Sequence, residues 1–379
     1  MIPSVSQIPI QQLASGDRLS IQLYKFIGQH PGKKAYLQAN LHGSEISGNA
    51  AIHQLIEFLM TLDPSQLAGE IWLVPVCNPL ATNQRSHHFS SGRYSAYDGK
   101  DWNRIFWDYE KEQEGDEISD FAKSQLHLSP PEIRHNYLTL IQQRFHQLLD
   151  EIKSPAGVPF TDRYRYILQS LCLDANYVID CHSSTNQGLD YLYCFDARQD
   201  SAKSFLLDYA LLMNEYDGDA FDEAFLKPWL ALEKQLALLG KNFTFDVESW
   251  TLELGAGMQM NPESVAKGVR GIKNYLSQKG MLDIPGFPLP ETQDFSVEFT
   301  PKDCVQKYYA LLGGMIQWRI PLGTRVKTGD RLYQLLTFDK SDRFPKLIDV
   351  CAQTDGFIFD LSTNHSVNEA DYVLSMFSQ

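Results

Sequence analysis

Residues 35–59 change from the hydrophobic period of a strand to that of a helix across one short polar turn. The segment AYLQANL (35–41) has the pattern of a strand, and HGSEISGN (42–49) interrupts it. The apolar residues after the turn recur at helical spacing and are Ile52, Leu55, Ile56 and Leu59. A strand that leads into a helix through a tight turn is a unit of layered α/β folds, so this stretch constrains the fold strongly.

Further strand and helix patterns alternate along the first 280 residues. Strands are predicted at IWLVPVC (71–77), NYVIDC (176–181), DYLYCF (190–195), NFTFDVE (242–248) and TLELG (251–255). The clearest helix begins after Asn261, which can cap it, with Pro262 in its first turn and Gly280 at its end. The alternation predicts an α/β layered sheet.

Two segments depart from this alternation. Residues 108–165 combine an acidic run with a charged helical pattern, which predicts a helical insertion that covers part of the sheet; a lid with a direct role is the alternative. The proline-containing segment 281–300 reads as a linker, and short β runs with turns follow it. We therefore place a larger domain at residues 1–297 and a smaller β domain at residues 298–379.

Charge and cysteine content exclude several classes of partner and compartment. The net charge of −14 would repel nucleic acid and an anionic membrane surface. The N-terminus lacks the pattern of a signal peptide, and no window reaches the ~18 to 20 apolar residues of a membrane span. The six cysteines are scattered without a C-x-x-C pair, mostly in apolar runs, which favours buried free thiols. We expect a cytoplasmic protein without nucleic-acid or membrane partners. The sequence does not decide between a monomer and a homo-oligomer.

Three candidate metal ligands follow predicted strands. His42 and Glu45 stand three positions apart in the first turn, and an imidazole with a carboxylate suits Zn²⁺. Such a pair is common by chance, and a polar turn with a helix-entry glutamate is the simpler interpretation of it alone. His182 ends a second apolar strand, where a histidine in a hydrogen-bonded turn is the alternative. Because parallel strands end at one rim of a sheet, we expect the three side chains to converge.

A hydrolytic zinc site with three protein ligands also needs a general base. Glu253 lies in the apolar strand TLELG, directly before Leu254 and Gly255. A carboxylate in such a strand is costly to bury without a partner or a role. Glu248, five residues earlier, is the rival candidate, and we favour Glu253.

The polar segment 78–106 supplies further candidates, which are Arg85, Arg93, Asn103 and Arg104. An arginine binds carboxylates through two parallel hydrogen bonds and can stabilise a developing oxyanion. The alternative is a surface loop of solvated charges, which is an equal prospect for Arg85 and the neighbouring His87 and His88.

The ordered motifs HGSE, NP, DWNR, DCHSS and LELG resemble those of the succinylglutamate desuccinylase/aspartoacylase family, which is related to the zinc carboxypeptidases. The resemblance covers residues 35–280 and extends into the C-terminal β region. It implies a catalytic domain with a zinc carboxypeptidase-like mixed sheet flanked by helices. It also implies that His42, Glu45 and His182 bind one Zn²⁺ per chain.

The same resemblance implies roles for five other residues. Glu253 corresponds to the general base and acid, and Asp101 to the carboxylate that orients the first zinc histidine. Asn103 and Arg104 correspond to the pair that receives the substrate carboxylate. Arg93 corresponds to the arginine that polarises the carbonyl.

Two features depart from the family pattern or extend it. Arg93 lies ten residues before Asn103, a longer spacing than in the aspartoacylase type, so Arg85 stays an alternative. Residues 313–336 resemble the β half-repeat of biotinyl/lipoyl-type barrel-sandwich domains but lack an MKM-like acceptor lysine. We expect this region to be structural or a wall of the pocket, with lysines such as Lys327 solvated.

These features together predict a zinc-dependent amidohydrolase, a deacylase that acts on an N-acyl amino acid or a related small amide. One alternative is a zinc carboxypeptidase, a metallopeptidase that cleaves peptides. Another is a catalytically silent small-molecule binder. A serine hydrolase that uses Ser183 or Ser184 beside His182 is disfavoured, because the sequence has no G-x-S-x-G elbow.

Overall fold

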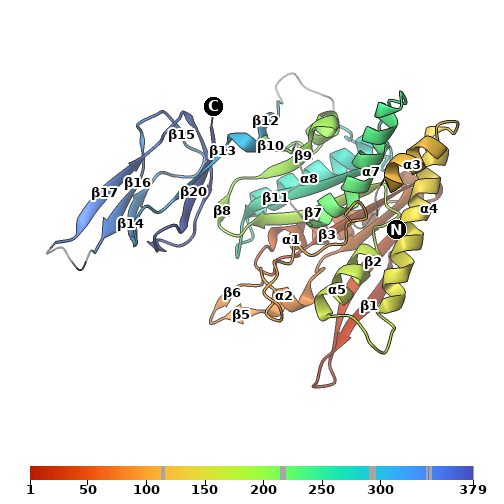
Figure 1. Ribbon diagram of the computed structural model, residues 1–379, viewed down its shortest axis with the longest axis horizontal. Helices are drawn as coiled ribbons and strands as arrows, with labels where there is room; N and C mark the ends of the chain where they lie inside the picture. The colour runs from red at the N-terminus through yellow and green to blue at the C-terminus, as the bar shows by residue number, and fades with distance from the viewer. Residues whose placement is uncertain (112–115, 214–218, 290–295, 339, 341–343, 379) are drawn as a thin grey trace.

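A nine-stranded mixed sheet forms the centre of the larger part of the molecule in the computed structural model, which describes residues 1–111, 116–213, 219–289, 296–338, 340 and 344–378 (Figure 1). The strand order is β1-β2-β4-β3-β7-β11-β9-β10-β12. The strands are β1 (Ser4–Gln12), β2 (Arg18–Ile27), β3 (His30–Ala39), β4 (Ala68–Val74), β7 (Tyr177–Ser184), β9 (Tyr191–Phe195), β10 (Tyr209–Met213), β11 (Glu248–Ala256) and β12 (Glu298–Pro301). The large mixed sheet with its helices confirms the predicted α/β class.

The three central strands β3, β7 and β11 run parallel to one another. Seven of the eight residues of β7 are buried, as expected for a strand covered on both faces. Because the three strands are parallel, their carboxyl ends meet at one rim of the sheet. The chain segments that leave this rim carry His42, Glu45 and the residues that follow His182.

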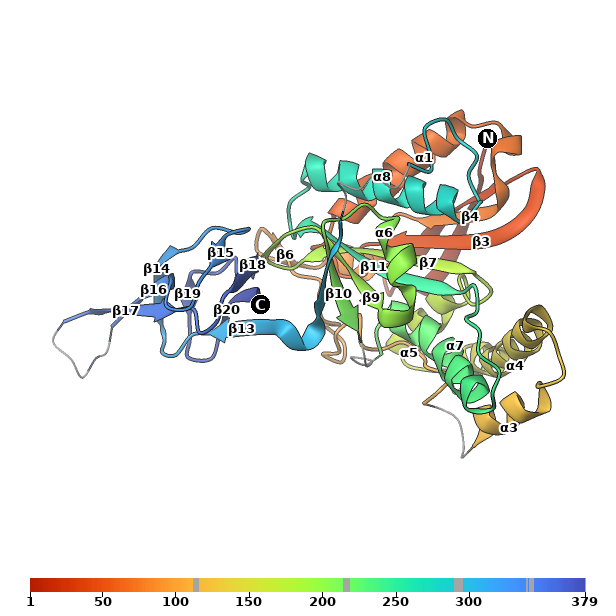
Figure 2. The ribbon, with the colours of Figure 1, turned by 90° about the horizontal axis from the view of Figure 1, so that it is seen from above.

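Helices cover both faces of the sheet (Figure 2). On one face lie α1 (Ser47–Thr61) and α8 (Pro262–Gln278). On the other lie α3 (Glu117–Ser124), α4 (Pro130–Glu151), α5 (Phe160–Gln169) and α7 (Phe221–Leu238). Shorter elements are α2 (Pro79–Asn83), α6 (Gln199–Lys203), the hairpin β5 (Arg85–Ser86) and β6 (Phe89–Ser90), and the 3-10 helices η1 (Pro64–Gln66) and η2 (Asp196–Arg198). Among the described residues, no helix is both long and apolar enough to cross a membrane.

The predicted start and end of α8 are confirmed. The Asn261 side chain accepts a hydrogen bond of 2.9 Å from the backbone N–H of Glu263, and Pro262 occupies the first turn. Gly280 follows the helix with a φ of 71°, a left-handed conformation that favours glycine.

The described part of segment 108–165 forms α3, α4 and α5 and packs beside α7. At its start, the buried side chain of Asp108 forms an ion pair with the buried side chain of Lys227 on α7. Further along, the Tyr137 hydroxyl donates a hydrogen bond of 3.1 Å to the carbonyl of Pro228. Helices of this segment therefore join the hydrophobic core on this face of the sheet.

One predicted strand is wrong, because residues 242–247 form no regular strand and β11 begins only at Glu248. The alternating aromatic residues of this segment pack against α7 instead of pairing in the sheet: Phe243 contacts Phe245, which contacts Trp229. The backbone N–H of Phe245 donates 2.7 Å to the Glu233 carboxylate rather than to a neighbouring strand. Side-chain packing thus explains the alternating pattern.

The C-terminal region forms two small sheets. The first has the order β13-β20-β18-β15, with β8 added to β18, and the second has the order β17-β16-β14-β19. The strands are β8 (Gln187–Gly188), β13 (Val305–Tyr309), β14 (Gly314–Arg319), β15 (Arg325–Val326), β16 (Arg331–Thr337), β17 (Lys346–Cys351), β18 (Gly356–Leu361), β19 (Ser366–Val367) and β20 (Tyr372–Ser378). Between β12 of the large sheet and β13 lies only the 3-10 helix η3 (Lys302–Cys304). Residues 290–295 of the predicted linker lie outside the described residues.

The thiols differ in burial. Cys77, Cys172, Cys181 and Cys194 are buried, as predicted. Cys304 is half-buried and Cys351 is exposed, so the prediction of buried thiols is wrong for these two. Cys304 lies in the 3-10 helix η3, and Cys351 ends the largely exposed strand β17.

Candidate active site

The turn between β3 and α1 is shaped by Asn40, which adopts a left-handed conformation with a φ of 69°. Its amide group donates hydrogen bonds to the carbonyls of His42 (3.0 Å), Gly43 (3.3 Å) and Glu45 (3.2 Å). These bonds close the chain into a tight bend directly after the strand. The bend turns the side chains of His42 and Glu45 toward each other.

Gly43 allows a second chain segment to approach this turn. A Cβ atom at Gly43 would lie 2.0 Å from the carbonyl oxygen of Ala81. The Gly43 N–H also donates 2.9 Å to the carbonyl of Gly92, directly before Arg93. The contact therefore requires glycine, and it brings the segment that carries Arg93 and Asp101 next to His42.

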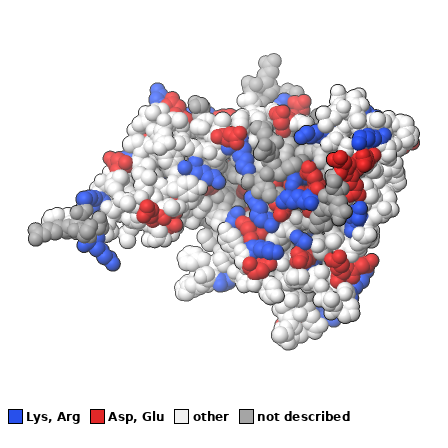
Figure 3. Space-filling view, viewed as in Figure 1, with Lys and Arg blue, Asp and Glu red and all other residues white. Residues whose placement is uncertain are grey.

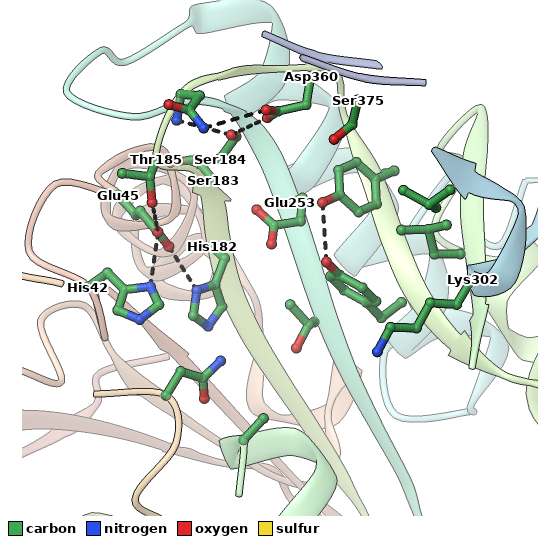
Figure 4. A pocket seen from close by; sticks show the side chains of 18 of the residues that line it. His42, Glu45, His182, Ser183, Ser184, Thr185, Glu253, Lys302, Asp360 and Ser375 are labelled. Atoms are coloured by element: carbon green, nitrogen blue, oxygen red, sulfur yellow. Dashed lines mark hydrogen bonds and ion pairs between the residues drawn. The ribbon is translucent and has the colours of Figure 1, made fainter. Parts of the chain in front are cut away.

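His42, Glu45 and His182 converge at the rim of the sheet and could hold a metal ion (Figure 4). Each offers one ligand atom, and these atoms lie within 4.8 Å of one another. The Glu45 carboxylate lies between the two imidazoles, 2.9 Å from His42 Nδ1 and 2.8 Å from His182 Nδ1. All three side chains are buried, with at most 3% of each residue exposed.

A second carboxylate lies behind each histidine. Asp101 Oδ1 is 2.9 Å from His42 Nε2, and Asp180 Oδ2 is 2.9 Å from His182 Nε2. A histidine whose Nε2 bonds a carboxylate keeps Nδ1 free for a metal and has a fixed ring orientation. The structure thus brings Asp101 to His42, and the contact of Asp180 with His182 was not among the sequence predictions.

The charges of this cluster support one another. Burial alone would raise the pKa of Glu45, but the two histidines hold it far below its usual range. Burial alone would lower the pKa of His182, but Asp180 and Glu45 raise it well above its usual value. Burial would also raise the pKa of Asp101, but His42 and Arg93 lower it to about 2. In the absence of a metal, the neighbouring opposite charges thus stabilise the charged forms of these buried side chains. A bound cation would change these pKa values, because it would add its own charge to the site.

Glu253 lies directly beside this cluster. It occupies the position paired with His182 on the neighbouring parallel strand β11. Its Oε2 atom is buried and has no hydrogen-bond partner among the described residues. Burial and the charge of Glu45 raise the pKa of Glu253 to about 7, which suits a group that takes up and releases a proton near neutral pH.

The rival Glu248 lies at the other end of β11 and already has partners. Its carboxylate is 2.6 Å from Lys279 Nζ and accepts hydrogen bonds from Tyr275 (2.6 Å) and Ser201 (2.8 Å). These contacts satisfy a buried carboxylate and tie α8 to the sheet. Glu253 lines the pocket, whereas Glu248 does not.

Arg93 bridges several members of the cluster. Its Nε atom lies 3.0 Å from Asp101 Oδ2, and its Nη1 atom lies 3.6 Å from Glu45 Oε1. Nη1 also donates 3.0 Å to the hydroxyl of Thr185, which in turn donates 3.2 Å to Glu45. The guanidinium is therefore held at the edge of the cluster while part of it remains accessible from the pocket.

Asn103 and Arg104 also line the pocket, whereas Arg85 does not. Asn103 Oδ1 accepts a hydrogen bond of 2.9 Å from the backbone N–H of Phe221, at the start of α7. Arg85 is exposed in the β5–β6 hairpin, where it donates to the carbonyls of Thr82 and Gln84. Of the two arginines left open by the sequence, the structure brings Arg93 to the cluster and leaves Arg85 outside it.

The histidines and serines near the motifs have other surroundings. His87 and His88 are exposed at the tip of the same hairpin. Ser184 donates a hydrogen bond to Asp360, and both ring nitrogens of His182 face carboxylates. No serine–histidine pair of a serine hydrolase is therefore formed by His182 and its neighbours.

The C-terminal region supplies one wall of the pocket. Its strand β18 pairs with β8, which follows β7 and His182. Asp360 of β18 accepts hydrogen bonds from Ser184, from Asn186 (3.5 Å) and from the hydroxyl of Tyr372. The expectation of a structural region or a pocket wall agrees with this placement, and Asp360 and Lys302 line the pocket.

Two groups were absent from the candidate residues named from sequence. Asp180 stands two positions before His182, and residues two apart on a strand point to the same face, so the D-x-H pattern was an available signal. Asp360 lies 176 residues from Ser184 in the sequence, and no local pattern indicates this contact.

The charges on the face of the molecule seen in Figure 3 are mixed, with Lys and Arg side chains interspersed among Asp and Glu. The chain as a whole is acidic, with a net charge of −14. The pocket is likewise mixed in charge, with Arg93, Arg104 and Lys302 among its basic side chains and Asp222, Glu223 and Asp360 among its acidic ones.

The family model and the similar solved structures carry the name of the same family. The family model of the succinylglutamate desuccinylase/aspartoacylase catalytic domain matches residues 31–129. A curated relative, the N-alpha-acetyl-L-2,4-diaminobutyric acid deacetylase of Halomonas elongata, is 25% identical over 344 residues, which cover 90% of this chain and 81% of the relative.

Two solved structures are similar over nearly the whole chain. A succinylglutamate desuccinylase/aspartoacylase family protein from Shewanella amazonensis SB2B is 28% identical with a TM-score of 0.86, covering 99% of this chain and 98% of the other. A second such protein, from Shewanella frigidimarina NCIMB 400, is 25% identical with a TM-score of 0.86, covering 100% and 97%. Residues 31–129 thus match the catalytic-domain model of the succinylglutamate desuccinylase/aspartoacylase family, and the whole chain shares the fold of solved members of that family.

Proposed function

We propose that the protein is a zinc-dependent amidohydrolase that removes the acyl group from an N-acyl amino acid. The observation that carries the proposal is the placement of Glu253 beside a buried cluster of two histidines and one carboxylate. The family and the deacetylase relative support the same class of reaction.

The cluster fits zinc by the chemistry of its donor atoms. Two imidazole nitrogens and one carboxylate oxygen form the ligand set of many catalytic zinc sites, which leave a further position open. His42 and His182 would bind through Nδ1, because Asp101 and Asp180 face their Nε2 atoms. When bound, zinc supplies Lewis acidity that polarises a carbonyl and lowers the pKa of water.

Glu253 would move the proton in the reaction. Its Oε2 atom would accept a proton from the attacking water and return it to the leaving amine nitrogen. The pKa of about 7 suits both transfers, because a group poised near neutral pH can serve as base and then as acid.

The positive side chains of the pocket would bind the substrate. Arg93 would stabilise the negative charge that develops on the carbonyl oxygen. Arg104, with Asn103 beside it, would hold the carboxylate of the amino acid. The zinc ligands, Glu253 and this anion site would together fix the scissile amide in one orientation.

A comparison of substrates tests the proposal. Initial rates would be measured for N-acetyl and N-succinyl amino acids, for N-alpha-acetyl-L-2,4-diaminobutyric acid and for short unmodified peptides. We expect faster hydrolysis of at least one N-acyl amino acid than of any peptide. Faster cleavage of peptides would instead support a metallopeptidase, and no hydrolysis of any amide by zinc-loaded protein would support a silent binder.

A further inference from the structure

The pocket continues well beyond the cluster of His42, Glu45 and His182. Its volume is about 720 Å³, within the range of pockets that bury drug-sized ligands. The N-acetyl derivative of a small amino acid is much smaller than such a ligand. It would therefore fill only the part of the pocket next to the metal site.

The floor of the pocket crosses four neighbouring strands. His182 on β7 is paired with Glu253 on β11. Thr251, two residues before Glu253, is paired with Tyr193 on β9, which is paired with Leu211 on β10. Residues paired in this way point to the same face of a sheet. With neighbouring strands about 4.8 Å apart, the row is about 14 Å long.

The chemistry of the floor changes along this row. The end at β7 and β11 carries His182 and Glu253, whereas the floor at the other end is apolar and aromatic, with Lys302 and Lys307 at its edge. We call the second part the apolar arm, and it consists of Tyr191, Tyr193, Phe195, Leu211, Met213 and Val305. In Figure 4, Glu253 lies between the His–Glu–His cluster and Lys302, which marks the far side of the pocket.

Packing against both parts of the chain holds the residues of the apolar arm in place. Tyr191 and Leu211 belong to one hydrophobic cluster with Phe359 of the C-terminal sheet, and Val305 packs against it. Because strands of the large sheet support it from below and the C-terminal region from the side, the arm is held open by both parts of the chain. Tyr193 and Val305 are the half-buried members of the arm, and a small substrate at the metal site would leave them uncovered.

We propose that the substrate carries an extended apolar group, a chain of about four to six carbons or an aromatic ring, that lies in the apolar arm. This inference rests on the proposed amidohydrolase function and specifies its substrate class. The group belongs either to the acyl part or to the amino-acid side chain, because both flank the scissile amide. Burial of apolar groups next to the reacting bond raises kcat/KM by about fourfold per methylene when the arm is dry.

Two series of substrates test the inference and distinguish the two sources of the apolar group. The first lengthens the acyl chain from N-acetyl- to N-butanoyl- and N-hexanoyl-L-alanine. The second keeps the acetyl group and changes the side chain from L-alanine to L-norleucine and L-phenylalanine. We expect kcat/KM to rise at least tenfold along one series. A fall in kcat/KM along both series would overturn the inference.

A substitution at the far end of the arm links the effect to this surface. Val305 is half-buried and lines the pocket, so Val305→Trp would fill the arm while leaving the zinc ligands in place. We expect kcat/KM for the long substrate to fall at least tenfold more than kcat/KM for the N-acetyl substrate. Val350, half-buried on β17 and outside the pocket, supplies the matched control Val350→Trp.

The outcome also separates this inference from the proposed function. Hydrolysis of N-acetyl-L-alanine with no gain from either longer series would reject the apolar arm as a substrate site and leave the amidohydrolase function intact. Absence of hydrolysis of every N-acyl amino acid would reject the function itself. If Val305→Trp fails to fold, calorimetric titration of Glu253→Gln protein with N-acetyl-L-alanine, N-hexanoyl-L-alanine and N-acetyl-L-norleucine gives the same comparison, and equal affinities for all three would overturn the inference.

Discussion

Glu253 and His182 occupy paired positions on the parallel strands β11 and β7, so a partly buried carboxylate lies one strand away from a candidate metal ligand. The pairing places a proton-accepting group beside the cluster without any loop between them. Sites built on strands hold their side chains more precisely than sites built on loops. This relationship leads to five predictions.

Arg93 should be needed for catalysis, whereas Arg85 should not. Arg93→Ala removes the guanidinium that lies at the edge of the cluster, and loss of one such group costs about 10² to 10³ in kcat. Arg85→Ala is the matched control, because Arg85 is exposed in the hairpin outside the pocket. Steady-state kinetics on the best N-acyl amino acid give the result, and equal losses in the two variants would contradict the assigned role.

The carboxylates behind the histidines should set the affinity for zinc. Asp101→Asn and Asp180→Asn each remove one charge that orients an imidazole, and such changes weaken metal binding about 10- to 100-fold. Asp349→Asn, on the exposed face of β17, should leave the affinity unchanged. Competition with a chromophoric chelator measures the dissociation constants, and unaltered zinc affinity in both site variants would rule out this role.

Zinc affinity should fall as the pH falls. Burial lowers the pKa of His42 and His182, but Glu45, Asp101 and Asp180 outweigh it, and both pKa values are raised. The metal-free histidines therefore still bind protons near neutral pH, and zinc must displace these protons. Affinity should rise with pH through the raised pKa values, as measured by chelator competition between pH 6 and pH 9. A pH-independent affinity would show that other ligands hold the metal.

Asp360 should connect the C-terminal region to the site. It accepts hydrogen bonds from Ser184 and Asn186 on either side of Thr185, which contacts both Glu45 and Arg93. Asp360→Asn replaces one accepting oxygen by a donor, so one of these bonds is lost.

We expect a loss of about tenfold in kcat/KM for Asp360→Asn, roughly the effect of one buried hydrogen bond to a charged group. The control is Asp355→Asn, since Asp355 bonds Thr328 in an exposed turn of the same region. An unchanged kcat/KM in a correctly folded Asp360→Asn protein would mean that the C-terminal contact does not position the site.

Much of the site could be predicted because its residues follow apolar strands. His42, Glu45, His182 and Glu253 stand at or near the ends of β3, β7 and β11, and parallel strands bring such ends together. The long-range contacts could not be predicted in this way. The Asp360 contact depends on how the C-terminal sheet docks, which no periodicity in the sequence describes.

Strand prediction from local hydrophobic patterns also failed at two segments, because tertiary packing determines whether each segment joins the sheet. Residues 242–247 alternate like a strand, but Phe243 and Phe245 pack on α7 and the backbone bonds a side chain. At the N-terminus, β1 is an edge strand that contains Pro9 and many exposed residues, so its apolar signal is weak. In both places the environment of the segment, rather than its own sequence, decides whether it joins the sheet.

Glu253→Gln tests the central claim most directly, with Glu57→Gln on the exposed surface of α1 as its control. Metal content and hydrolysis of an N-acyl amino acid would be measured on the same purified samples. We predict one zinc per chain in the parent and in both variants, with hydrolysis reduced by at least 10³ only in Glu253→Gln. Full hydrolysis by the zinc-loaded Glu253→Gln protein, or active parent protein without metal, would contradict the account.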